Sequence, residues 1–329
     1  MRRRNLLRTL AGGAAFGLLG GGRLAEAQSS AGGIRSAQSR KPLLGFSTYG
    51  MKQIPVYEAI SHIAKIGYKG LEFTLIPGWE TDPKQLSKTK RADIRKRIED
   101  LGLTLSSLQE SLQLADPNAM TKLGFKINYT QAENLERLRE AAALAHELSP
   151  GAPPVIETQA GGRAGAWEES KRGMADRLSE WAKALEPLKT VVAIKGFVGT
   201  AMDTPDKMLW LVDQVKSPWI RIGYDYSHLK LLGLDMRKTI RQVGSRLAFI
   251  HVKDSVGTQE KFRFLLPGDS GEINYKEYAQ ALSEVGYRGP VMVEVSVHVS
   301  GQPGYDPIAA AKRSWDNLSP SFAATTAPG

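Results

Sequence analysis

The feature that most constrains the fold is an unbroken alternation of short β-branched runs with longer helical periods. Eight runs have strand character, at 43–49, 70–76, 103–109, 154–159, 190–196, 219–225, 246–252 and 290–296. Each run is followed by a stretch with helical periodicity. Strands that alternate with helices in this way indicate a parallel sheet, and eight such repeats predict a (β/α)8 TIM barrel of the α/β class. A doubly wound sheet is the alternative, but no glycine-rich phosphate loop follows any of the runs.

The first residues of the chain have the pattern of an export signal. Residues 1–27 combine a basic start, a modest apolar stretch and small residues before a plausible cut after Ala27. Arg3 and Arg4 resemble the twin-arginine signal, which a receptor reads and which carries folded cargo. The sequence therefore predicts a periplasmic or otherwise exported protein.

The remaining chain is expected to contain one domain. Residues 28–41 are rich in Ser, Gly and Gln and predict a flexible linker. We expect a single barrel over residues 42–320 and a disordered tail over residues 321–329. The absence of cysteine excludes disulfides, thiol catalysis and thiolate metal sites.

The charge pattern bears on the partners of the protein. The predicted signal holds five arginines and one glutamate, so it carries +4 of the formal net charge of +10. The densest remaining basic cluster, at 88–97, alternates with an apolar helix face, which favours a solvated helix over a nucleic-acid site. We expect no nucleic-acid partner, no membrane contact beyond the export machinery, and leave the oligomeric state open.

Polar residues recur at the ends of the predicted strands. In a barrel the C-terminal ends of the strands form the floor of the active site. Side chains that are far apart in sequence are therefore expected to meet at one mouth. The candidates are Glu72, Gln109, Glu110, Glu157, Lys195, Asp225, His228, His251, Lys253, Asp254, Glu294 and His298. Trp79, in the loop after the second strand, is an aromatic candidate for stacking on a ligand.

Four motifs carry a resemblance to a known family: DYSH at 225–228, HVKD at 251–254, GDSGEINY at 268–275 and GYRGPVMVEVS at 286–296. They are similar to the sugar-phosphate isomerase/epimerase-like, or xylose isomerase-like, TIM barrels. That superfamily holds xylose isomerases, tagatose 3-epimerases, inosose dehydratases and endonuclease IV. The resemblance covers residues 43–318. It implies an enzyme with a small-molecule sugar substrate.

The reaction that the resemblance implies is the movement of a proton next to the carbonyl of a keto-sugar, through a metal-stabilised enediolate. Two alternatives stay open. One is a related lyase or dehydratase that acts on a 3-keto sugar or glycoside, and the other is a non-catalytic barrel that binds a sugar.

The resemblance also implies roles for individual residues. One divalent metal, Mn²⁺, Mg²⁺, Co²⁺ or Zn²⁺, would be held by Asp225, His251 and Glu294. His228 matches the histidine that contacts substrate oxygens beside the metal. The expected substrate-binding set is His228, Glu72, Lys253 and Trp79. The expected catalytic set is Glu294, Lys195 and Glu157.

The fifth strand departs from the pattern of the family, because Lys195 stands where a metal-binding glutamate is usual. Three consequences are open. In the first, the metal is lost and the ammonium pairs with Glu294 and Asp225. In the second, the metal is retained with Glu157 as a replacement ligand. In the third, Lys195 acts as an acid/base group opposite Glu294. A nearby metal and burial would lower the pKa of Lys195, whereas carboxylates without a metal would raise it.

Overall fold

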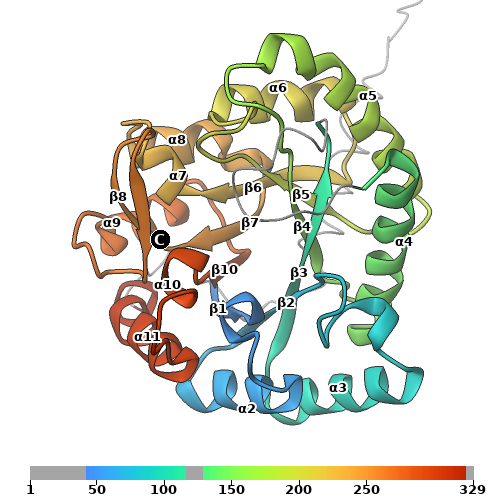
Figure 1. Ribbon diagram of the computed structural model, residues 1–329, viewed down its shortest axis with the longest axis vertical. Coiled ribbons are helices and arrows are strands. Elements are labelled where there is room, and N and C mark those ends of the chain that lie inside the picture. The colour runs from blue at the N-terminus through green and yellow to red at the C-terminus, as the bar shows by residue number, and fades with distance from the viewer. Residues whose placement is uncertain (1–41, 116–128, 324–329) are drawn as a thin grey trace, which may run out of the picture.

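A closed parallel barrel forms the centre of the molecule. The computed structural model describes residues 42–115 and 129–323. Within them, eight strands close in the order β1-β10-β7-β6-β5-β4-β3-β2 (Figure 1). These strands are β1 (Leu43–Ser47), β2 (Gly70–Thr74), β3 (Thr104–Gln113), β4 (Val155–Gln159), β5 (Val192–Lys195), β6 (Ile220–Asp225), β7 (Leu247–Val252) and β10 (Pro290–Val293). The first and last strands pair in parallel and close the barrel, so the predicted fold is confirmed.

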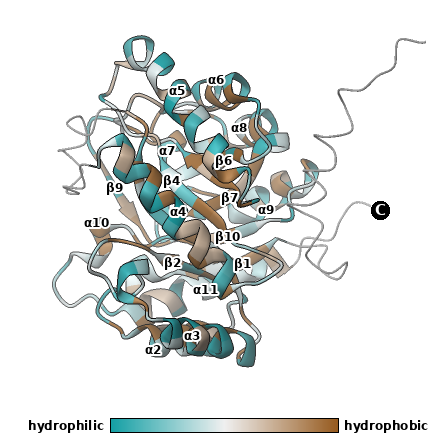
Figure 2. Ribbon diagram, turned by 90° about the vertical axis from the view of Figure 1, so that its right-hand side faces the viewer, coloured by the Kyte–Doolittle hydropathy of each residue, from teal (hydrophilic) through white to brown (hydrophobic). Residues whose placement is uncertain are grey.

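Helices surround the strands, one after each (Figure 1). The main helices are α2 (Val56–Ile66), α3 (Lys88–Asp100), α4 (Gln131–Leu148), α5 (Trp167–Leu185), α6 (Pro205–Val215), α8 (Met236–Val243), α9 (Tyr275–Glu284) and α11 (Pro307–Ala323). Helix α2 buries Val56, Ala59, Ile60 and Ile63, the spacing of one helix face against a core. Figure 2 shows the consequence, with hydrophobic residues along strands such as β7 and largely hydrophilic residues on α3.

The interior of the barrel is filled beneath its mouth. Ala193, Phe249 and Met292, from three strands, form a buried cluster inside the barrel. Gly45 and Gly70 leave room for the Met292 side chain, because a Cβ on either glycine would lie about 2.4 to 2.5 Å from it. Side chains alternate between the two faces of a strand. The residues two positions further along each strand therefore form the next layer toward the mouth, above a closed floor.

Two features of the fold differ from the sequence prediction. A hairpin of β8 (Asp254–Gly257) and β9 (Phe262–Leu265), for which no strands were predicted, follows β7. Helix α11 continues through Ala323, past the expected end of the domain at residue 320, so residues 321–323 are helical. The predicted signal and linker, and residues 324–329 of the predicted tail, lie outside the described residues. Among the residues described, no helix is long and apolar enough to cross a membrane.

Candidate active site

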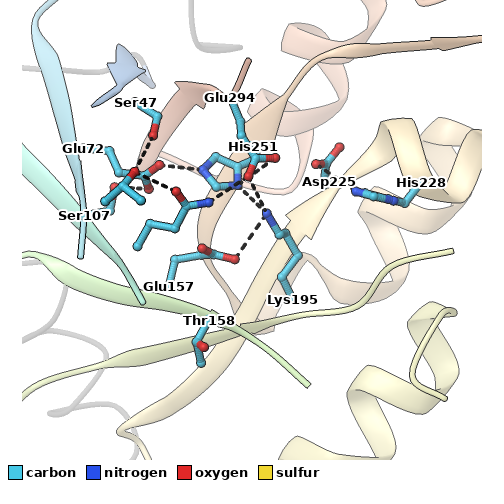
Figure 3. Close-up of polar contacts among 12 residues, drawn as sticks. Ser47, Glu72, Ser107, Glu157, Thr158, Lys195, Asp225, His228, His251 and Glu294 are labelled. Carbon is cyan, nitrogen blue, oxygen red and sulfur yellow. Dashed lines mark hydrogen bonds and ion pairs between the residues drawn. The ribbon is translucent and has the colours of Figure 1, made fainter. Parts of the chain in front are cut away.

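A layer of charged side chains follows the buried cluster of Ala193, Phe249 and Met292 toward the mouth. Figure 3 shows this layer. Its members come from the middle of β2 and β4 and from the C-terminal ends of β5, β6, β7 and β10. All are at least nine-tenths buried. They are Glu72, Glu157, Lys195, Asp225, His251 and Glu294. The structure thus brings together residues that the sequence placed at equivalent strand ends, as the barrel geometry requires.

Lys195 is the hub of this layer. Its Nζ lies 2.6 Å from Nδ1 of His251, 3.3 Å from Oε1 of Glu157 and 3.5 Å from Oε1 of Glu294. Burial acts to lower the pKa of Lys195, but the surrounding carboxylates, Glu157 first, outweigh it and raise the pKa above its usual range. Among the described groups, Lys195 therefore keeps its proton. A resident metal would lower the pKa of Lys195, whereas the side chains around it raise this pKa.

Lys253 is the second ammonium group of the site. Its Nζ donates to Oδ2 of Asp225 and to Oε2 of Glu294. We expected this lysine to bind substrate, but its ammonium is hydrogen-bonded to two carboxylates of the site. Because His251 and Lys253 are two residues apart at the end of β7, both side chains lie on the same side of the chain. The ring of Phe264, from the hairpin, lies 5.0 Å from the ammonium.

Glu294 is held by two hydrogen bonds and by an ion pair with Lys195. Besides the two lysines, Nε2 of Gln109 donates to its Oε1 at 2.7 Å. Burial acts to raise the pKa of Glu294, but Lys195 and Lys253 hold it well below its usual range. Glu157 is in the opposite situation: neither of its carboxyl oxygens has a hydrogen-bond partner among the described residues, and burial raises its pKa. Two carboxyl groups whose environments separate their pKa values are a common arrangement of acid and base.

Glu72 orients His251 and does not face a substrate. Its Oε1 lies 2.8 Å from Nε2 of His251, and its Oε2 accepts a hydrogen bond from Ser107 at 2.7 Å. The expected substrate-binding role of Glu72 does not fit this position, because the residue is fully buried and both oxygens are used. Burial lowers the pKa of His251 and Glu72 raises it, with a net upward direction. In the tautomer that carries its proton on Nε2 and donates to Glu72, Nδ1 of His251 accepts the hydrogen bond from Lys195.

The spacing of three side chains is that of a metal site. Asp225, His251 and Glu294 each offer one ligand atom, and these atoms lie within 4.8 Å of one another. Such a group could bind a divalent ion. The charges oppose one, because Lys195 or Lys253 contacts each of the three side chains. Glu157, the expected replacement ligand, is not part of this group.

His228 has an unused nitrogen beside the charged layer. Its Nε2 lies 3.6 Å from Oδ2 of Asp225, while its Nδ1 is buried without a hydrogen-bond partner among the described residues. Phe197 stacks on the imidazole at 5.1 Å and Phe264 meets it edge-on at 4.7 Å. Burial lowers the pKa of His228 to about 3, so the ring is neutral near pH 7. This buried nitrogen is available to a ligand.

A cavity of about 150 Å³ opens where β1, β2 and β10 end. It is lined by Tyr49, Gly50, Lys52, Gln53, Trp79, Val297, Ser300 and Tyr305. Trp79 stacks on Tyr49 at 6.1 Å, so one face of the indole is not free for the expected sugar stacking. Burial raises the pKa of Tyr49, and the negative charge of Glu294 raises it further. Tyr49 is therefore close enough to Glu294 to feel its charge, so the cavity adjoins the charged layer. Sequence analysis missed Tyr49, although it follows the end of β1 by two residues.

The fold is an α/β barrel with a buried group of carboxyl, ammonium and imidazole side chains at its mouth. The sequence profile of the xylose isomerase-like TIM barrel family matches residues 60–318, and the chain belongs to that family.

Similar proteins include sugar epimerases and dehydratases. The chain is 27% identical over 194 residues to D-psicose 3-epimerase of Enterocloster bolteae, covering 53% of this chain and 62% of that protein. It is 26% identical over 142 residues to inosose dehydratase of Clostridium tetani, covering 39% and 47%. The chain therefore spans roughly half of the length of these two relatives. A crystal structure of the IOLI protein with a zinc atom has a similar fold, with a TM-score of 0.67 and 18% identity over 85% of this chain and 99% of that one.

Proposed function

We propose that the protein moves a proton on a carbon next to the carbonyl of a keto-sugar, as sugar isomerases and epimerases do. The observation that carries the proposal is the contact of one buried ammonium, on Lys195, with two carboxyl groups, Glu157 and Glu294. A carboxylate that takes a proton and an ammonium that gives one are the two groups this reaction needs. Relatives that are sugar epimerases support the choice of substrate.

The mechanism assigns a role to each group. Glu294 takes the proton from the carbon as the C–H bond breaks, and the electron pair moves onto the carbonyl oxygen to form an enediolate. Lys195 donates to that oxygen, because preorganised positive charge stabilises charge that develops in the transition state. Glu157, on the far side of Lys195, can supply the proton that the ammonium gives up. Transfer of the proton from Glu294 to the neighbouring carbon gives an isomer. Transfer of a proton from Lys195 to the opposite face of the original carbon gives an epimer, after which solvent takes the proton from Glu294 and restores that of Lys195.

Binding groups surround these residues. The free Nδ1 of His228 can receive a hydrogen bond from a sugar hydroxyl or donate one to it, depending on the tautomer. The cavity lined by Tyr49 and Trp79 offers space for the part of the substrate away from the reacting carbons. Both regions adjoin the charged layer, through Asp225 and Glu294 respectively.

Elimination is the second candidate. The same enediolate can expel a β-hydroxyl or an alcohol instead of regaining its proton, and one relative is an inosose dehydratase. This outcome requires a 3-keto sugar or glycoside with a leaving group beside the acidic carbon.

The test is solvent exchange. The purified protein is incubated in D₂O with a panel of ketoses and 3-keto-glucosides, and proton NMR follows deuterium at the carbons next to each carbonyl. We expect exchange with at least one sugar, and none with the variant Glu294→Gln. The control Glu284→Gln, on the exposed face of α9, should behave as the wild type. Formation of an enone without exchange would favour elimination, and sugar binding without either reaction would favour a non-catalytic barrel.

A further inference from the structure

We infer that the positive charge of this active site is the chain's own, supplied by the ammonium groups of Lys195 and Lys253 in place of a divalent metal. The inference deepens the proposed function and rests on it, because this charge is what would stabilise the enediolate. The charge comes from two primary amines, one at the end of β5 and one just after the end of β7.

The first support is that the candidate ligand group is already satisfied. Lys253 bonds Asp225 through Oδ2 and Glu294 through Oε2. Lys195 contacts the remaining member, with its Nζ 2.6 Å from Nδ1 of His251. An oxygen or nitrogen of each of the three side chains therefore already contacts an ammonium group. A metal would have to compete with the lysines for those atoms.

The second support is the orientation of the imidazole. Nε2 of His251 is held by Glu72 at 2.8 Å, so Nδ1 is the nitrogen left to face the centre of the site. A metal needs the lone pair of that nitrogen. In this arrangement the lone pair accepts a hydrogen bond from Lys195.

The third support is local charge. Two carboxylates of the candidate ligand group, Asp225 and Glu294, each contact at least one ammonium group, so each already has a positive partner. Both lysines are 2% exposed, so neither ammonium can turn into water without leaving the packed mouth. A divalent ion bound to the same side chains would lie next to two positive charges in a buried site, where repulsion is weakly screened.

Lys195 is the residue whose substitution tests the inference. It stands at the end of β5, where the resemblance described above implies a metal-binding glutamate. Exchange of the ammonium for a carboxylate removes one competing cation and adds one ligand to the group of Asp225, His251 and Glu294. Lys195→Glu should therefore create a metal site, and Lys195→Gln should remove the competing charge without adding a carboxylate.

The experiment measures metal and activity separately. Wild-type protein, Lys195→Glu, Lys195→Gln and the surface control Lys238→Glu are each loaded with Co²⁺ or Mn²⁺, dialysed, and assayed for metal by elemental analysis. Visible absorption reports Co²⁺ coordination, and circular dichroism reports folding. We expect substoichiometric metal in the wild type and the control, and close to one ion per chain in Lys195→Glu. Deuterium exchange by the wild type should be unchanged by EDTA.

Several results would overturn the inference. A tightly bound stoichiometric ion in the wild type would do so, as would exchange that is lost in EDTA and restored by Mn²⁺. A folded Lys195→Glu variant that binds no ion would also contradict it. If that variant does not fold, the wild-type metal content and the Lys195→Gln variant still decide the matter. Failure of every sugar to exchange would instead count against the proposed function, because the metal measurements do not depend on a substrate.

Discussion

Replacement of Arg137 by methionine should destabilise the barrel in a pH-dependent way. This buried arginine on α4 ties three segments together: it bonds Oδ1 of Asp82 at 2.8 Å, the carbonyl oxygen of Leu75, and Oε1 of Glu110. Asp82 in turn accepts a hydrogen bond from the backbone of Gly78 at 3.0 Å. The arginine thus anchors the loop that carries Trp79 beside the barrel mouth.

The size of the effect follows from burial. Glu110 and Asp82 are 1% and 3% exposed, so removal of the guanidinium leaves two buried carboxyl groups without their main partner. Loss of one member of a buried ion pair costs about 3 to 5 kcal/mol. For a domain of this size that corresponds to a fall in melting temperature of roughly 10 °C. The surface control Arg95→Met, which breaks an exposed 3.9 Å pair, should cost less than about 1 kcal/mol.

The sign of the pH dependence comes from Glu110. Burial raises its pKa from 4.5 to about 7, although Arg137 lowers it. The folded state therefore binds this proton more tightly than the unfolded chain, and the stability associated with it is lost as pH rises between about 4.5 and about 7. Across that window the loss is about 3 kcal/mol. Without Arg137 the pKa moves higher, so the variant should lose more stability near pH 8 than near pH 5.

The assay is urea unfolding followed by circular dichroism near pH 5 and near pH 8 for the single and double variants. The double variant Arg137→Met/Glu110→Gln should recover much of the loss near pH 8, since glutamine carries no charge. Equal losses at both pH values, or a double variant no more stable than Arg137→Met, would refute the reasoning.

Three other predictions concern catalysis and export. Glu294→Gln should abolish deuterium exchange while unfolding stays cooperative in a thermal melt, because the remaining barrel contacts are untouched; exchange at the wild-type rate would remove Glu294 from the mechanism. Glu72→Gln should lower the exchange rate about 10- to 100-fold by loosening His251, with a larger effect on kcat than on KM, and an effect on KM alone would contradict a positioning role. Changing Arg3 and Arg4 to lysine should leave the precursor in the cytoplasm, as fractionation would show, whereas unaltered export would indicate the general secretory route.

The barrel itself could be predicted from sequence because each repeat carries a strong local signal. Strand β6, for example, is an apolar run that ends at Asp225, and all six of its residues were included in the predicted strand. The hairpin β8–β9 escaped prediction because its strands, DSVG and FRFL, are not runs of β-branched and apolar residues like those of the barrel strands. Its pairing depends on contacts with the rest of the fold, such as the bond from the Phe264 N–H to Nδ1 of His298.

The sequence could predict which residues lie in the candidate site, but not which side chains contact one another there. The strand-end rule placed Glu157, Lys195 and His251 together correctly. It could not show that Glu72 lies behind His251, because both residues obey the same alternation and only the packed structure shows which carboxylate the imidazole meets. The inward direction of Lys253 was accessible in principle, since it follows His251 by two residues.

The closed floor beneath the charged layer bears on how such a barrel can acquire new chemistry over evolutionary time. Lys195 replaces the glutamate suggested by family resemblance, yet β5 keeps its regular pairing with β4 and β6 through Ala193 and Ile194. The hydrogen-bond ladder and the packed residues below do not depend on which reactive group stands at the strand end. The terminal side chain of β5 can therefore change without a change in strand pairing, although the buried charges around it must still be matched.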